Sequence, residues 1–188
     1  MAPDAGSDAG TDAGLAGTPV TLECVPAVAG NETASGMVLS AGFWTGFRFQ
    51  VSAGSDLTTT AIAINVRSSS AGTIFGAIVR LTSMTDAPDA ADLTGGDVAA
   101  MTTLSVPGGP SSATVSAPIT ATLSPGWYAA VFGTGAFGAT LASATVHSNS
   151  GTGGCGSGFG YPFTLRQSDG ALILQAATPH FAVHGVRP

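Results

Sequence analysis

Short segments in which apolar and polar residues alternate recur along this chain, and glycine- or proline-rich turns separate them at roughly ten-residue spacing. Residues 42–52 show the alternation clearly, because Phe47, Phe49 and Val51 recur at every second position. Successive side chains of a β-strand point to opposite faces, so this period predicts a strand with one apolar face. The same alternation predicts a strand over residues 58–67.

The remaining periodic segments predict an all-β chain of about nine or ten strands. No ten-residue stretch has helical spacing with a capping signature, and only residues 87–91 suggest a single helical turn. Short strands joined by glycine and proline turns are typical of a two-sheet antiparallel β-sandwich of the jelly-roll or Greek-key type. The further predicted strands are residues 18–25, 73–82, 100–106, 113–123, 127–132 and 181–186, and residues 140–147 are an additional candidate. Residues 163–166 and 172–176 are predicted to form a hairpin. The segment 113–123 contains Pro118, so we expect it to be an edge or bulged strand.

Charged residues are scarce. They make up 9% of the chain, against about 25% in typical soluble domains. There is no lysine, and 19 serines and 23 threonines supply most of the polarity. Threonine combines β-propensity with a side chain that water can solvate. We therefore expect antiparallel strands with one wetted, hydroxyl-rich face.

Residues 3–14 are three copies of a four-residue unit, Pro-Asp-Ala-Gly, Ser-Asp-Ala-Gly and Thr-Asp-Ala-Gly. The unit has no apolar stripe to bury. We therefore predict a flexible spacer over residues 1–17 and a single β-sandwich domain over residues 18–188.

The charge pattern excludes two classes of partner. The formal net charge is −6, three of the eleven acids lie in the spacer, and the five arginines form no basic run. Binding to nucleic acid and adhesion to anionic lipid depend on clustered cations, so we expect neither. No apolar stretch approaches the roughly 20 residues that cross a bilayer, so we expect no transmembrane segment.

Cys24 and Cys155 are the two cysteines of the chain. Three interpretations are possible: inert buried thiols, a metal-binding pair or a disulfide. A metal cluster needs about four closely spaced ligands, and the glycine loop around Cys155 is a poor place for a buried thiol. We favour a disulfide, which would contribute about 2–5 kcal/mol and indicates an oxidising compartment. No export signal follows Met1, so we expect that one was removed and that the protein is extracellular or on the outer cell surface.

Four segments carry a resemblance to known proteins: residues 78–83, 92–98, 123–139, with the run Leu-Ser-Pro-Gly-Trp-Tyr, and 181–186. They resemble exported β-sandwich domains of bacterial proteins that have a C-terminal sorting anchor of the PEP-CTERM type. The Asp-Ala-Gly units are similar to spacers that follow the lipidated cysteine of secreted myxobacterial lipoproteins. The resemblance implies export, a surface or matrix setting and a tether at the N-terminus. It implies no catalytic residues.

An acidic loop over residues 84–97 contains the densest group of oxygen ligands: Asp86, Asp89, Asp92 and Asp97. Calcium takes six to eight oxygen ligands, so these four aspartates are candidate metal ligands. Their spacing does not match the EF-hand loop. The alternative is an acidic loop that only contacts water. Calcium is the single cofactor that we consider; otherwise we expect none.

Catalytic motifs are absent from the sequence. There is no Gly-x-Ser-x-Gly elbow, and the two glutamates, Glu23 and Glu32, both lie near the start. His180 and His184 share one face of a predicted strand, but a separation of about 13 Å by strand rise is too large for one metal ion. We therefore expect a protein that is not an enzyme.

Aromatic side chains give a candidate ligand platform. Trp127 and Tyr128 are adjacent in a predicted strand, so they face opposite sides. We assign Trp127 to the core, and we expect Tyr128 and Trp44 to be exposed and able to stack on a sugar.

These observations favour a secreted or surface-tethered, non-enzymatic β-sandwich that acts as a structural, adhesive or extracellular-assembly component. Its partner would be a protein or glycan at the cell surface, or a second copy that accepts residues 1–25 as a donated strand. The alternatives are a lectin-like carbohydrate-binding module, with or without calcium, and a hydrolase of unrecognised type.

Overall fold

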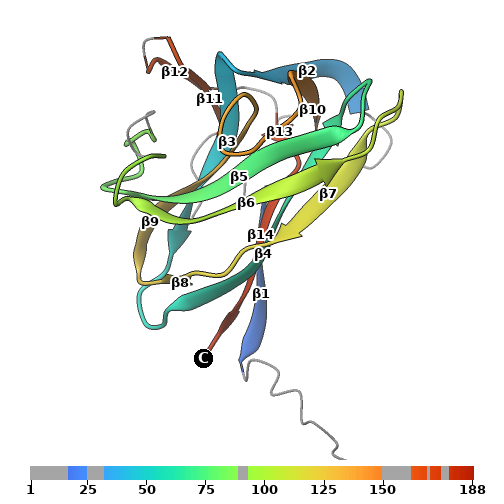
Figure 1. Ribbon diagram of the computed structural model, residues 1–188. Helices are drawn as coiled ribbons and strands as arrows, with labels where there is room; N and C mark the ends of the chain where they lie inside the picture. Colours follow the sequence, from blue (N-terminus) through green and yellow to red (C-terminus); the bar gives the residue numbers. More distant parts are fainter. Residues whose placement is uncertain (1–16, 25–31, 89–92, 150–161, 169, 175–177) are drawn as a thin grey trace, which may run out of the picture.

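The computed structural model describes residues 17–24, 32–88, 93–149, 162–168, 170–174 and 178–188 (Figure 1). Every regular element in these ranges is a β-strand, and none of these residues forms a helix that could span a membrane. The strands are β1 (Thr18–Cys24), β2 (Glu32–Ser40), β3 (Phe43–Val51), β4 (Leu57–Arg67), β5 (Gly72–Leu81), β6 (Val98–Val106), β7 (Ala113–Pro118), β8 (Thr122–Leu123), β9 (Gly126–Gly133), β10 (Ser143–Asn149), β11 (Phe163–Arg166), β12 (Leu172–Leu174), β13 (Thr178–Pro179) and β14 (Phe181–Arg187).

The all-β fold class is confirmed, but the strand count is higher than expected, with fourteen strands in the described residues. The extra strands are β2 and the two-residue β13, which the sequence pattern missed, and β8, which forms where Pro118 divides the predicted segment 113–123. Proline cannot donate a ladder hydrogen bond, so the first part ends there as β7. Residues 1–16 of the predicted spacer, Cys155 and residues 89–91 of the expected helical turn lie outside the described residues.

Hydrogen bonds join all fourteen strands into one sheet, so a division into two sheets is not confirmed. The main path runs β1-β14-β4-β10-β2-β3-β9-β5-β6, and the other five strands pair with its members or with one another. All paired strands are antiparallel. The path starts at β1 and ends at β6, so the sheet is not closed.

The main core forms because the sheet folds over on itself. Phe181 on β14 stacks on Phe47 of β3 and on Phe132 of β9, with ring centroids 5.3 Å and 5.5 Å apart. These strands are well separated in the sheet order, so the contact brings the two halves of the sheet face to face. All three rings are fully buried, and inward-facing aliphatic residues from ten of the strands complete this cluster.

A second apolar cluster covers the opposite face of β3, β5 and β9. Trp44 packs edge-on against Phe75, with centroids 4.9 Å apart, and Phe137 of the loop after β9 packs on both rings. A Cβ at Gly133 would collide with both the Trp44 and Phe75 rings, so glycine is required there. The expected single wetted face is therefore wrong for these strands, because a loop buries their second face.

Both ends of the folded body lie together. β1 is antiparallel to β14 in unbroken register from Thr18 opposite Arg187 to Cys24 opposite Phe181. Figure 1 shows the start of β1 beside the C-terminus at the lower end of the molecule, and the β11–β12 hairpin at the upper end. A segment that enters β1 therefore joins the body at the end remote from that hairpin.

Replacing Phe181 with alanine should lower the free energy of unfolding by about 3–5 kcal/mol, because the change removes a buried ring on which two others stack. Urea denaturation followed by tryptophan fluorescence measures this change. Val38→Ala is the matched control, since Val38 is 53% exposed and should change stability by less than about 0.5 kcal/mol. Equal effects of the two substitutions would contradict the packing described.

Candidate functional site

An open pocket of about 510 Å³ lies where the segment after β5 meets the first residues of β9. The indole of Trp127 is half-buried there, and the side chains of Arg80 and Asp97 are exposed. The pocket is lined by Arg80, Leu81, Thr82, Asp86, Ala87, Asp97, Gly126 and Trp127.

Asp86 holds the wall of this pocket in shape. Its Oδ2 accepts hydrogen bonds from the backbone N–H and the hydroxyl of Thr82, at 2.8 Å and 2.7 Å, and its Oδ1 accepts one from the N–H of Ala87 at 2.9 Å. The bonds from Thr82, the side-chain hydroxyl first, lower the pKa of Asp86. This carboxylate is therefore ionised at neutral pH and is used to order its own loop.

The position of Asp97 is fixed by a hydrogen bond of its main chain and not of its side chain. The N–H of Arg80 donates to the carbonyl of Asp97 at 2.8 Å, which ties the end of the acidic loop to β5. No ion pair between the two side chains is found among the described contacts. The pocket therefore presents an anion, a cation and an indole ring to solvent.

Arg48 lies buried on the face of β3 that the second apolar cluster covers, with 4% of its surface exposed. Its guanidinium carbon is 5.5 Å from the centre of the Phe163 ring, a cation–π contact, and its Nε has no hydrogen-bond partner in the described structure. Burial lowers the pKa of Arg48, whereas the nearby charge of Asp86 raises it. This attraction gives a second reason why Asp86 sits over this part of the sheet.

Two of the four candidate calcium ligands, Asp86 and Asp97, line the same pocket. Asp89 and Asp92 lie outside the described residues. Within the described part, no three histidine, cysteine or acidic residues come together as metal ligands. Both oxygens of Asp86 already accept hydrogen bonds, which leaves Asp97 as the carboxylate of the pocket that is open to a ligand. Calcium binding by the full loop stays a prediction.

The two aromatic residues expected to be exposed are buried. Trp44 is 5% and Tyr128 3% exposed, so the prediction that they present a stacking surface is wrong. The Trp44 indole N–H donates to the carbonyl of Thr134 at 3.3 Å. Tyr128 stacks on Phe49, and its hydroxyl donates to the carbonyl of Ser124 at 2.9 Å. Desolvation by burial raises the pKa of Tyr128.

Trp127, which we assigned to the core, packs against the second apolar cluster, and it also lines the pocket. Adjacent residues of a strand face opposite sides, and both sides of β9 are covered here, so Tyr128 packs in the main core and Trp127 packs on the second cluster. Tyr128 packs in the main core through its stacking on Phe49, and no local sequence pattern indicates this contact because the two residues are far apart in the sequence.

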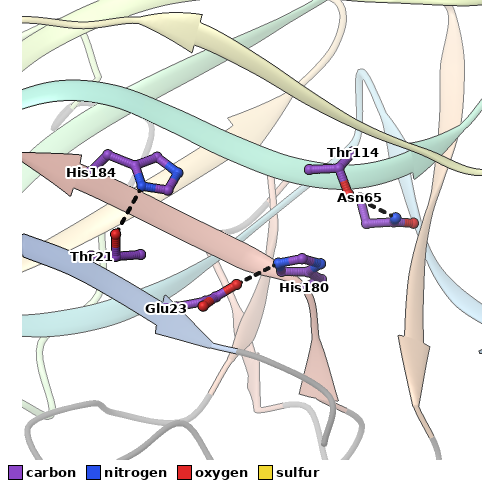
Figure 2. Close-up of polar contacts among 6 residues, drawn as sticks. All are labelled: Thr21, Glu23, Asn65, Thr114, His180 and His184. Carbon is purple, nitrogen blue, oxygen red and sulfur yellow. Dashed lines mark hydrogen bonds and ion pairs between the residues drawn. The ribbon is translucent and has the colours of Figure 1, made fainter. Parts of the chain in front are cut away.

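A second polar group lies on the outer side of β1, β14, β4 and β7, and Figure 2 shows its six residues. Nε2 of His180 is 2.8 Å from Oε1 of Glu23, and a hydrogen bond of 3.1 Å joins Nδ1 of His184 and Oγ1 of Thr21. Nδ2 of Asn65 donates to Oγ1 of Thr114 at 3.2 Å. Each histidine has its own partner on β1, so these contacts fasten β1 to β14 and to the residue that precedes it (Figure 2).

Cys24, at the end of β1, is completely buried and is not a free thiol. Its predicted partner Cys155 lies outside the described residues, so the pairing of the two stays a prediction.

No protein-family model matches the chain, and no curated protein is similar to it.

Acid should weaken the loop that Asp86 organises. The folded-state pKa of Asp86 lies below its ordinary value, which is about 3.9. Its contribution to stability is therefore complete above about pH 4 and is lost as the pH falls through the folded-state pKa. Thr82→Val removes the strongest donor and should raise the pKa of Asp86 toward the ordinary value.

A carboxyl-carbon NMR titration of the wild-type protein and of Thr82→Val measures this shift, and Ser124→Ala, outside the loop, serves as the control. If Asp86 of the wild-type protein titrates at or above its ordinary pKa, the proposed role of the two Thr82 bonds is wrong.

Proposed function

We propose that this chain is a secreted, surface-tethered, non-enzymatic adhesive domain that binds a glycan in the pocket of Arg80, Asp97 and Trp127. The observation that carries the proposal is the combination in one open pocket of an indole ring with exposed side chains of opposite charge. The proposal treats the folded-over sheet as a two-layer sandwich of the jelly-roll or Greek-key type.

The chemistry of the pocket suits a saccharide. A sugar ring has an apolar face of C–H groups, which packs on the indole face, and a rim of hydroxyls, which act as donors and acceptors. Asp97 accepts hydrogen bonds and Arg80 donates them, so the pair can hold adjacent hydroxyls of one ring. Because Asp86 and its three hydrogen bonds already order the loop, little conformational entropy would be lost on binding.

The setting at a cell surface is supported by the sequence. The Asp-Ala-Gly spacer precedes β1, and β1 enters the body at one end, beside the C-terminus. A tether there would hold the opposite end away from the attachment point. The scarcity of charge, the predicted Cys24–Cys155 disulfide and the resemblance to exported bacterial domains favour the same compartment.

A glycan array followed by isothermal titration calorimetry tests the proposal. The wild-type protein should bind at least one saccharide class, and Trp127→Ala and Asp97→Asn should each weaken binding tenfold or more, about 1.4 kcal/mol. Phe43→Ala is the control, because Phe43 is an exposed aromatic residue outside the pocket. Repeating the titration with calcium and with a chelator decides whether binding requires the metal ion.

If no saccharide binds with or without calcium, or if Trp127→Ala binds as tightly as the wild-type protein, the pocket is not a glycan site. Product formation in a broad screen of ester, glycoside and peptide substrates would instead favour the third hypothesis, a hydrolase.

A second candidate function is a subunit of an extracellular assembly. Ile173 and Leu174 of β12 are 43% and 56% exposed, and among the described strands β12 pairs with β11 alone. An apolar strand edge without charges is a template for pairing with another chain. The main path of the sheet also ends in two strands that pair on one side only among the described strands, β1 with β14 and β6 with β5.

The assembly hypothesis predicts that the molar mass measured by light scattering rises with protein concentration. Ile173→Lys should reduce this rise, because a charge blocks edge-to-edge pairing. Val38→Lys, a substitution of an exposed residue outside β12, is the control. A constant monomer mass over the concentration range would exclude this function.

A further inference from the structure

A second pocket, of about 310 Å³, lies at a different place from the proposed glycan site. It forms where the end of β4, the turn between β6 and β7, and the start of β10 meet, and its side chains differ in kind from those of the first pocket. The residues that line it include Arg67, Ser68, Ser69, Gly109, Ser143 and Thr145.

Specific contacts hold these segments together. Ser68, which is buried, forms an isolated parallel bridge to Gly108, and its carbonyl accepts a hydrogen bond from the N–H of Gly109 at 2.9 Å. Its hydroxyl donates to the carbonyl of Ser143 at 3.5 Å. A Cβ at Gly108 would lie 2.6 Å from the backbone nitrogen of Ala71, so the close approach of the two turns requires glycine. These contacts fix the segments that line the pocket relative to one another.

The pocket offers hydrogen-bond donors around one positive charge. Arg67 lies opposite Thr145 in the β4–β10 pairing, it is half-buried, and no described residue forms an ion pair with it. Ser69, Ser143 and Thr145, which carry hydroxyl groups, line the same space, and none of the described residues that line it is a carboxylate. A guanidinium with nearby hydroxyls is suited to a planar or tetrahedral oxyanion, because its parallel N–H groups bind two oxygens at once.

We propose that this pocket binds an oxyanion group, a sulfate or a carboxylate, carried by an acidic polysaccharide. The chain as a whole has a net charge of −6 and no basic run, so it does not attract polyanions at long range. Binding of an acidic polysaccharide must therefore depend on a local site where the charge is positive. The pocket at Arg67 is such a site, and it is independent of the pocket at Trp127.

The full-length protein is titrated with sodium sulfate, sodium acetate, a sulfated heparin octasaccharide and an octamer of galacturonic acid, and binding is followed by two-dimensional NMR. We expect saturable shifts of the amide signals of Ser68, Ser69 and Thr145 with at least one octasaccharide. Arg67→Gln should weaken that binding at least tenfold. Arg187→Gln is the matched control, because Arg187 lines neither pocket, and it should bind as the wild-type protein does.

The sulfated and carboxylated octasaccharides show which oxyanion is preferred, and the free anions show whether a polysaccharide is needed. Shifts that do not saturate, shifts that are equal in Arg67→Gln and the wild-type protein, or an equal loss of binding in Arg187→Gln would each overturn the proposal. Failure of the neutral glycan titration at Trp127 would leave this result unaffected, so the two proposals are tested separately.

Discussion

The fold depends on contacts between strands that are distant in the order of the sheet. Phe181, near the C-terminus, stacks on Phe47 and Phe132, and these contacts hold the open sheet folded over on itself. Apolar burial must provide most of the stability, because few ion pairs are available in a chain with 9% charged residues. Hydroxyl side chains also make burial possible, because the buried Thr45 and Thr59 donate hydrogen bonds to backbone carbonyls.

Strand positions are predictable where side chains alternate between large apolar and polar residues. Phe47, Phe49 and Val51 indicate β3 correctly, and Pro118 correctly marks an irregular strand. β2 is missed because its sequence, Glu-Thr-Ala-Ser-Gly-Met-Val-Leu-Ser, begins with small residues that alternate weakly. The joining of the strands into one sheet cannot be predicted, because it depends on single pairings such as Ser40 with Phe43 across the turn between β2 and β3.

The candidate site was less predictable than the strands. Asp86 and Asp97 were recognised as a group by their density in one loop, and the structure places both in one pocket. Burial of the outer faces was not foreseeable, because it depends on Phe137 and Leu93, which belong to loops. That burial encloses Trp44 and Arg48, which the alternation alone would leave in water. An aromatic or charged residue on the outer face of a strand is therefore not sufficient to predict a ligand site.

The two proposed binding sites each contain an arginine, since the chain has no lysine. Arg48 is buried against an aromatic ring, Arg80 faces the acidic loop, and Arg67 faces hydroxyls. Their surroundings differ, so the three guanidiniums cannot share one role. A low density of charge also means that no strong field draws ligands to the surface from beyond a screening length of about 10 Å. Binding at the two proposed sites must then depend on short-range geometry, and a planar guanidinium in a pocket provides the direction that a mobile ammonium group lacks.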